Sequence, residues 1–159
     1  MTYLIGIDVG TQSVRSRPFD LEDAVVASAS RPLTTTFPRP AWAKQDPEEW
    51  WRAAVEALKE ILQVSKVTPK EITALSYDCS ACTVVALTAD FFTSRLTGRM
   101  TASLNNATAK WNYARPLGGW PAGFLRAAKA ERLAEKWPSE VLPVGRALGR
   151  IHEAIACEV

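Results

Sequence analysis

The sequence is poor in several kinds of residue, and each shortage excludes a class of protein. Its 159 residues include three cysteines and one histidine, and the formal net charge is only +2. Lysines and arginines are scattered among acids, so there is no basic stripe and we expect no nucleic-acid partner. No apolar run approaches the roughly 20 residues that cross a bilayer, so we expect no membrane partner either.

The opening segment, MTYLIGIDVG, lacks the pattern of an export signal. It has no basic leader and carries an acid inside its apolar stretch, which predicts a strand and not a signal peptide. Few cysteines without an export signal favour a reducing compartment. We therefore expect a cytoplasmic protein.

The residues that are present have the composition of a globular domain. Hydrophobic residues make up 47% of the chain and charged residues 23%, which fits a folded protein and argues against disorder. The length suffices for one domain with a hydrophobic core.

Short runs of β-forming residues bounded by turns predict strands in the first half. Residues 3–8, 14–19 and 24–30 are expected to form one antiparallel meander. Pro18 cannot donate a hydrogen bond to a ladder, so the second strand is expected to be at an edge, bulged or damaged. Residues 72–77 and 83–87 predict a further strand pair.

Helix signals complete an α/β pattern. Asp46-Pro47-Glu48-Glu49 predicts a helix start, with Asp46 as the N-cap, proline at the first position and acids in the first turn. We expect this helix to pack on the meander. The second half has little strand signal; residues 91–96, stopped by Gly98, and residues 124–136 predict helices.

The segment DVGTQSVR, residues 8–15, is the strongest candidate for chemistry. A carboxylate at the end of a buried strand, here Asp8, can hold magnesium, usually through water. Gly10 permits close approach to a phosphate. Hydroxyl and amide donors follow at Thr11 and Ser13, and Arg15 adds a charged fork. The alternative is an ordinary hairpin whose tight turn needs glycine.

Cysteine spacing allows a second interpretation. Cys79-Ser80-Ala81-Cys82 is a C-x-x-C pair, and His152 with Cys157 could complete a zinc site. The two pairs lie far apart in the sequence, so a chance match is the competing explanation. A small zinc-binding module therefore stands as an alternative.

Six segments, in order along the chain, carry a family resemblance. YLIGIDVGTQSVR resembles the opening of the FGGY carbohydrate kinases, which belong to the actin-like ATPase superfamily, and WAKQDPEEWW resembles their W-x-E-Q-D-P-x-x-W-W motif. ITALSYDCSACTVVAL resembles the next strand pair. FFTSRLTGRMTASLNNATAKWNY, GGWPAGFL and VLPVGRALGRI resemble the later part of the first domain in pentulose kinases.

The resemblance implies a ribonuclease-H-like fold, ATP and magnesium as cofactors, and phosphoryl transfer to a sugar hydroxyl, a pentulose in the members most alike. By match, Asp8 would face the metal, while Gly10, Thr11, Gln12, Ser13 and Arg15 would face the γ-phosphate. Lys110 matches a lysine that contacts the sugar, and Asp78 lies on a loop near that pocket. The alternative for Lys110 is a solvated lysine beside a packing tryptophan.

Departures from the family pattern are as informative. After Asp90 a segment with a W-x-D-x-R motif is missing, so residues 1–90 and 91–159 are predicted to be two parts of one domain joined across a deletion. The aspartate that acts as general base, and the second domain that holds adenine, have no counterpart among these residues. We expect the chain alone to be inactive as a kinase, and to be marginally folded, to self-associate or to depend on a partner that covers its exposed face. A non-enzymatic remnant or interaction module is the alternative.

Overall fold

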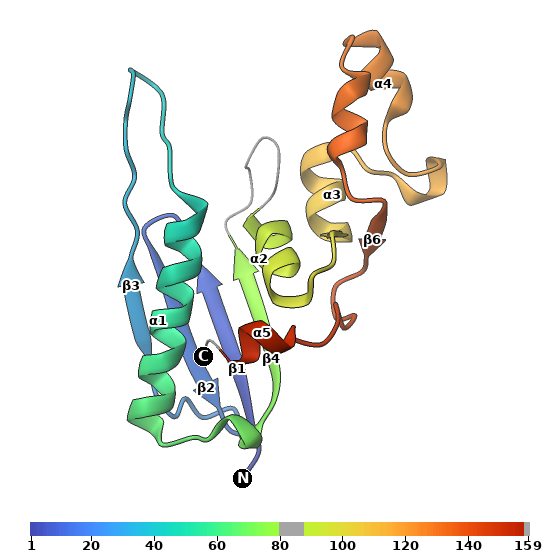
Figure 1. Ribbon diagram of the computed structural model, residues 1–159. Helices are drawn as coiled ribbons and strands as arrows, with labels where there is room; N and C mark the ends of the chain where they lie inside the picture. Colours follow the sequence, from blue (N-terminus) through green and yellow to red (C-terminus); the bar gives the residue numbers. More distant parts are fainter. Residues whose placement is uncertain (80–87, 158–159) are drawn as a thin grey trace. The chain divides into compact units, whose positions relative to one another are not determined.

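The computed structural model describes residues 1–79 and 88–157. These residues form two compact units, the first built mainly from residues 1–79 and the second from residues 88–156 (Figure 1). The predicted strand 83–87 and Cys82 lie outside the described residues. The division predicted at residue 90 rests on family motifs and stays a prediction.

The first unit is built on a mixed sheet of four strands in the order β3-β2-β1-β4. Its strands are β1 (Tyr3–Val9), β2 (Ser13–Phe19), β3 (Ala29–Pro32) and β4 (Ile72–Cys79). β1 pairs with β2 and β2 with β3 in antiparallel fashion, which confirms the predicted meander. β4 lies parallel to β1 on its other side.

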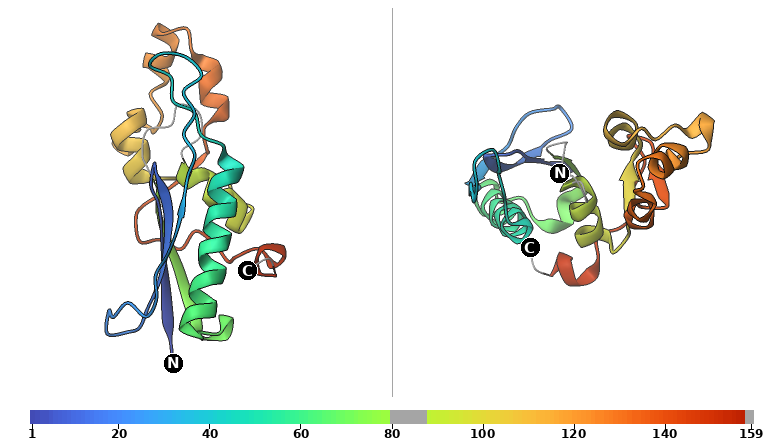
Figure 2. Two further views of the ribbon diagram at one scale, coloured as in Figure 1. Left: turned by 90° about the vertical axis from the view of Figure 1, so that its left-hand side faces the viewer. Right: turned by 90° about the horizontal axis from the view of Figure 1, so that it is seen from above.

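One face of this sheet is covered by α1 (Pro47–Ser65), as the left view of Figure 2 shows. The helix begins where the sequence predicts: the Asp46 side chain accepts a hydrogen bond from the Glu48 amide at 3.0 Å, which satisfies an otherwise unpaired donor. It ends at Lys66, whose backbone adopts the left-handed conformation. The short helix η1 (Pro69–Glu71) then leads into β4.

The core of the first unit lies between α1 and the sheet. Alternate residues of β1 and β2 are buried on this side, as the two-residue period of a strand requires, and the apolar stripe of α1 packs on them. The buried residues are Ile5, Ile7, Val9, Val14, Ser16, Pro18, Trp50, Trp51, Ala54, Leu58 and Ile61.

Pro18 does not place β2 at an edge, which corrects the sequence-based expectation. β2 lies between β1 and β3, and Pro18 pairs with Ile5 in regular register. The Pro18 carbonyl accepts a hydrogen bond from the Val26 amide at 2.9 Å, on the side away from β1. In a strand the nitrogen of a residue points to the same side as its carbonyl. The missing N–H therefore removes no bond to β1, and it lies beyond the end of β3.

The third strand also begins later than predicted, at Ala29 instead of residue 24. The Asp20 carboxylate accepts hydrogen bonds from the amides of Glu22 and Ala24, at 3.0 and 2.8 Å. These bonds form an aspartate turn, in which Asp23 adopts the left-handed conformation. The turn includes residue 24, where the sequence pattern had predicted the third strand to begin. Val25 keeps only an isolated bridge to Phe19.

The second unit is mostly helical. It contains α2 (Thr88–Thr97), α3 (Leu104–Trp111), α4 (Ala122–Ala127) and α5 (Glu153–Ala156), with 3-10 turns η2 (Arg115–Leu117) and η3 (Glu131–Lys136). Two three-residue strands, β5 (Thr101–Ser103) and β6 (Glu140–Leu142), pair in parallel. As predicted, α2 is stopped by Gly98, which has a φ of 69°.

The single helix expected over residues 124–136 is broken in two. Lys129 adopts a φ of 51° after the end of α4. The Ala130 amide donates to the Leu125 carbonyl at 2.9 Å, and the Lys129 amide donates to the Arg126 carbonyl at 3.0 Å. These two bonds are the Schellman pattern, which ends a helix by satisfying its last carbonyls. The chain resumes as η3 in a new direction.

Tyr113 and three tryptophans of the second unit form an aromatic cluster. The Trp120 ring centroid lies 4.6 Å from that of Trp137 and 4.9 Å from that of Tyr113. Trp111 joins through Trp137 at 5.5 Å. The Trp120 indole N–H donates to the Pro138 carbonyl at 3.3 Å, which gives the polar end of the ring a partner. Within the described ranges, no helix is long and apolar enough to cross a membrane.

Candidate functional site

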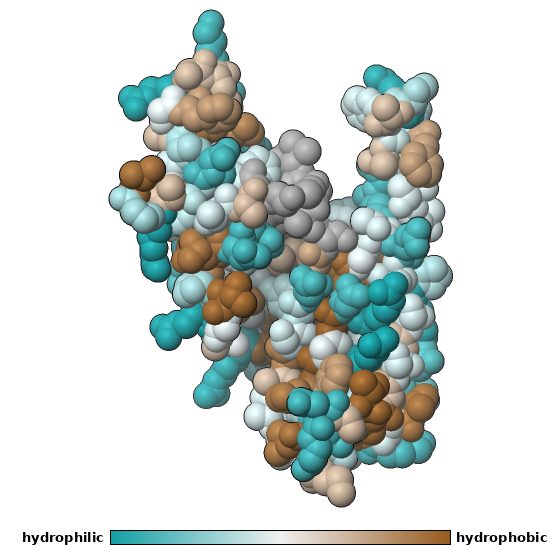
Figure 3. Space-filling model, turned by 180° about the vertical axis from the view of Figure 1, so that it is seen from behind, coloured by the Kyte–Doolittle hydropathy of each residue, from teal (hydrophilic) through white to brown (hydrophobic). Residues whose placement is uncertain are grey.

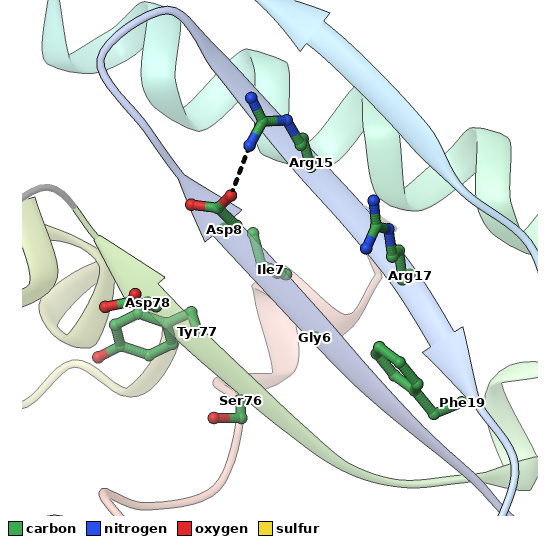
Figure 4. A pocket seen from close by; sticks show the side chains of 9 residues that line it. All are labelled: Gly6, Ile7, Asp8, Arg15, Arg17, Phe19, Ser76, Tyr77 and Asp78. Atoms are coloured by element: carbon green, nitrogen blue, oxygen red, sulfur yellow. Dashed lines mark hydrogen bonds and ion pairs between the residues drawn. The ribbon is translucent and has the colours of Figure 1, made fainter. Parts of the chain in front are cut away.

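A hollow of about 320 Å³ lies on the face of the first unit's sheet that points away from α1. Among the described residues of the first unit no helix covers this face, and hydrophilic side chains are interspersed with apolar ones there (Figure 3). The lining residues are Gly6, Ile7, Asp8, Arg15, Arg17, Phe19, Ser76, Tyr77 and Asp78 (Figure 4).

Strand alternation explains why charged groups gather in this hollow. Ile5, Ile7 and Val9 point under α1, so Gly6 and Asp8 must point to the opposite face. The antiparallel register places Arg15 opposite Asp8, and the parallel register places Asp78 beside it. Three adjacent strands therefore bring their charged side chains to one patch.

Asp8 and Arg15 form an ion pair, with 2.9 Å between Oδ2 and the guanidinium nitrogen Nη1 (Figure 4). Both side chains are half exposed, at 51% and 49%. An ion pair this exposed is worth at most about 1 kcal/mol. Each group is therefore accessible to a ligand of opposite charge.

Asp78 lies in β4 and not on a loop, which corrects the expectation from the family resemblance, and its side chain bonds to the following backbone amide. Its Oδ1 accepts a hydrogen bond from the Cys79 amide at 2.8 Å. This hydrogen bond holds Oδ1 of the Asp78 carboxylate against the backbone of β4. Asp8 and Asp78 thus supply two neighbouring carboxylates, the oxygen ligands that magnesium prefers, so the residues of the hollow fit the metal that the family resemblance implies.

In the turn between β1 and β2, the carbonyls of Thr11 and Gln12 are hydrogen-bonded, while the amides of the same two residues are not, among the described residues. The carbonyl of Thr11 accepts from the Gln45 side chain at 2.6 Å and that of Gln12 from the Leu33 amide at 2.8 Å. The carbonyl of Ser13 accepts from the Gly10 amide at 3.0 Å. Within the part of the chain that the structure describes, the amides of Thr11 and Gln12 donate no hydrogen bond. Unbonded amides in succession can bind an anion.

Gly10 is not required by the shape of this turn. Its φ lies outside the left-handed region that favours glycine, and an added Cβ would meet the Ser13 carbonyl oxygen at 3.4 Å, an ordinary contact. The alternative of a hairpin that needs glycine for its conformation therefore lacks support in the geometry. The close approach of a phosphate to Gly10 stays a prediction.

Sequence reasoning missed Gly6, Arg17, Phe19 and Ser76, which also line the hollow. The available signal was the two-residue period, since Gly6 precedes Asp8, Arg17 follows Arg15, and Ser76 precedes Asp78 by one period. Gly6 has a packing role, because an added Cβ would lie 3.2 Å from the Phe19 ring.

The sequence also predicts Lys110 as a sugar-binding residue and, alternatively, the cysteines as zinc ligands. Lys110 is in α3 of the second unit, so its contact with a sugar stays a prediction. Cys79 lies half-buried at the end of β4, while Cys82 lies outside the described residues. No group of three or more histidine, cysteine, aspartate or glutamate side chains within the described residues could hold a metal ion, so the zinc alternative gains no support from them.

Solved structures place this arrangement in the class of sugar-kinase folds. A gluconate kinase from Lactobacillus acidophilus superposes with a TM-score of 0.84 and 15% identity, over 99% of this chain and 45% of that chain. A xylulose kinase from Rhodospirillum rubrum gives 0.76 and 20%, over 98% and 46%. A glycerol kinase from Plasmodium falciparum gives 0.77 and 12%, over 99% and 46%. These likenesses establish the ribonuclease-H-like α/β fold.

Residues 3–114 match the N-terminal domain of the FGGY family of carbohydrate kinases, and the chain belongs to this family. A glycerol kinase from Variovorax paradoxus is 41% identical over 75 residues, which are 47% of this chain and 15% of that protein. Glycerol kinase 2 from Thermotoga maritima is 32% identical over 75 residues, with the same shares. The chain spans less than half the length of the solved relatives that it matches.

Proposed function

We propose that this chain supplies the phosphate-binding and metal-binding part of an ATP-dependent carbohydrate kinase site. The observation that carries the proposal is the β1–β2 turn, where the amides of Thr11 and Gln12 donate no hydrogen bond among the described residues. This donor pair lies in the sequence between the half-exposed carboxylate of Asp8, three residues before Thr11, and the guanidinium of Arg15, three residues after Gln12. Amide donors, a carboxylate and an arginine are together the components that a metal-bound terminal phosphate requires.

The residues of this site divide into a phosphate-binding group and a magnesium-binding group. The amides of the turn and the Arg15 guanidinium bind phosphate oxygens, while Asp8, with Asp78 beside it, binds magnesium through water or directly. When bound, magnesium neutralises charge on the phosphates of ATP. Phosphoryl transfer rests mainly on such positioning and charge stabilisation. The present side chains can therefore contribute to catalysis without forming a covalent intermediate.

For the acceptor we propose the hydroxyl group of a pentulose, with Lys110 among its contacts. The motifs of residues 91–151 support this choice. The named solved relatives include xylulose, gluconate and glycerol kinases, so the family accepts several polyhydroxylated substrates. We further propose a cytoplasmic location, and no turnover by residues 1–159 alone, because the family's general base has no counterpart in this sequence.

Nitrogen-15 NMR titration with magnesium ADP and magnesium ATP tests the phosphate site directly. We expect shifts confined to residues 8–15 and 76–78, and weaker binding by Asp8→Asn. The matched control is Glu22→Gln, which removes the same charge from a side chain that makes no hydrogen bond or ion pair among the described residues. If millimolar nucleotide left the Thr11 and Gln12 amides unshifted, the non-enzymatic interaction module would become the better interpretation.

A further inference from the structure

Gln45 connects three segments of the first unit through one side-chain amide. Its Nε2 donates to the Thr11 carbonyl at 2.6 Å and to the Thr35 hydroxyl at 2.8 Å. Its Oε1 accepts from the Trp50 indole N–H at 3.1 Å. The contacts join the β1–β2 turn, the loop that follows β3 and the first turn of α1. Gln45 itself is half-buried and precedes the helix cap Asp46.

The chemistry of the three partners fixes how this amide is oriented. A backbone carbonyl can only accept a hydrogen bond, and an indole N–H can only donate one. The Gln45 nitrogen must therefore face Thr11 and its oxygen must face Trp50. Glutamate has nearly the same shape, but its carboxylate has no proton to donate to Thr11 at neutral pH. Glutamine is thus matched to this position by its donor and acceptor ends together.

The bond to Thr11 has a consequence for the next amide along the chain. The Thr11 carbonyl and the Gln12 N–H belong to one rigid planar peptide group. The described chain contains no cis peptide bond, so these two groups point in opposite directions. By holding the Thr11 carbonyl, Gln45 directs the Gln12 N–H to the side opposite Gln45. That N–H is one of the two donors that make no hydrogen bond among the described residues.

We propose that Gln45 is a positioning residue for the phosphate-binding turn. It fixes the Thr11–Gln12 peptide group against α1 and so aims the Gln12 N–H at the terminal phosphate of a bound nucleotide. The choice of phosphate as ligand rests on the function proposed above. The orientation of the peptide group by Gln45 does not depend on that function, and it can be tested without any ligand.

The test compares Gln45→Glu with the matched control Gln63→Glu, which makes the same change at an exposed position on α1. The first measurement is the nitrogen-15 order parameter of the Gln12 N–H in the ligand-free chain. We expect a fall from about 0.85, typical of rigid backbone, to below about 0.6 in Gln45→Glu. The strand amides of Ile7 and Val14, and every amide of Gln63→Glu, are expected to keep their values.

The second measurement is the affinity for magnesium ADP and for inorganic phosphate. We expect Gln45→Glu to bind both at least tenfold more weakly, and Gln63→Glu to bind as the unchanged chain does. If the Gln12 N–H stays rigid in Gln45→Glu, the positioning role is overturned, whatever the nucleotide affinity. If its order parameter falls but the unchanged chain binds neither ligand, the positioning role stands and the proposed phosphate site fails.

A folding defect in Gln45→Glu would be recognised by loss of the whole NMR spectrum. Gln45→Met then replaces it, because methionine is similar in length, uncharged and without a hydrogen-bond donor. The same local fall in the Gln12 order parameter is expected. A uniform fall across β1, β2 and α1 would show that Gln45 only stabilises the fold, and would overturn its specific role at the turn.

Discussion

Asp8 and Asp78 are register partners on the parallel strands β1 and β4. Two carboxylates therefore stand side by side on the face of the sheet that α1 leaves open, and Arg15 pairs with only one of them, Asp8. Arg15 competes with a metal ion for Asp8, but attracts a phosphate. The same side chain should thus act in opposite directions on the two ligands.

Arg15→Gln is expected to strengthen binding of magnesium alone and to weaken binding of magnesium ADP. Each change should be about fivefold, which corresponds to roughly 1 kcal/mol for exposed charges. Separate NMR titrations with magnesium chloride and with the nucleotide complex measure both. Arg126→Gln, a charge change in the second unit, is the control. Two affinities that move in the same direction would contradict this account of Arg15.

Asp46→Ala should destabilise the first unit by about 1 kcal/mol, because it leaves the Glu48 amide without its capping acceptor. Urea unfolding followed by circular dichroism gives the difference. Lys59→Ala, at an exposed position of the same helix, should change the free energy of unfolding by less than about 0.5 kcal/mol. An equal loss in both variants would show that the cap contributes nothing specific.

Stability should depend on pH through Glu71. Hydrogen bonds from the Thr68 backbone N–H and hydroxyl, both 2.9 Å long, lower the pKa of the Glu71 carboxyl from its ordinary 4.5. The folded state thus favours the carboxylate, and its contribution is present above pH 4.5 and lost as the pH falls through the lowered pKa.

Glu71→Gln should therefore be less stable than the unchanged chain at neutral pH, and this difference should shrink as the pH drops well below 4.5. Urea unfolding across the pH range at constant ionic strength measures the trend, and Glu22→Gln should show no such convergence. A difference that grows toward acid pH would have the wrong sign for this mechanism.

Residues 1–159 alone are expected to show no sugar-dependent turnover of ATP. The open hollow is proposed to bind phosphate and metal, but the general base that the family uses is not among residues 1–159, and the lack of a base costs a factor of roughly 10²–10⁴. A coupled ADP assay with ribulose, xylulose and glycerol tests this. Turnover that copurifies with the chain through two columns and disappears in Asp8→Asn would refute it.

The chain should self-associate, because the open face of the sheet carries apolar side chains such as Leu4, which is 41% exposed. Apolar surface that could be buried contributes about 25 cal/mol per Å². Sedimentation velocity at several concentrations, combined with thermal unfolding, is the measurement. A monomer at every concentration with a sharp transition at high temperature would show that this face is stable in water.

Structural features that depend on residues close together in the sequence could be predicted. The cap of α1 depends on Asp46 and its first turn, and the β1–β2 hairpin depends on one turn between two apolar runs; both were confirmed. The start of β3 was wrong, because the side-chain bonds of Asp20 compete with strand pairing over residues 20–24. The break after α4 was missed because a lysine, Lys129, occupies the left-handed position where glycine is usual.

Features that depend on distant pairing could not be predicted. The place of Ser76 and Asp78 beside Asp8 follows from the β1–β4 register, which joins strands far apart in the chain. Pro18 was misjudged because its tolerance depends on where β3 begins: Ala29, the first residue of β3, pairs with Ser16, so the pairing stops short of Pro18. The bond from Gln45 to Thr11 spans 34 positions, and no local pattern marks it.

The order β3-β2-β1, with α1 packed on these strands, favours folding of the first unit during synthesis of the chain. These elements follow one another in the sequence and pack on one another in space, so the first 65 residues can collapse through short loop closures. Synthesis proceeds from the N-terminus. The three strands β1, β2 and β3 can therefore assemble with α1 at the ribosome while later segments are still being added. β4 then pairs with the free edge of β1, which is already formed.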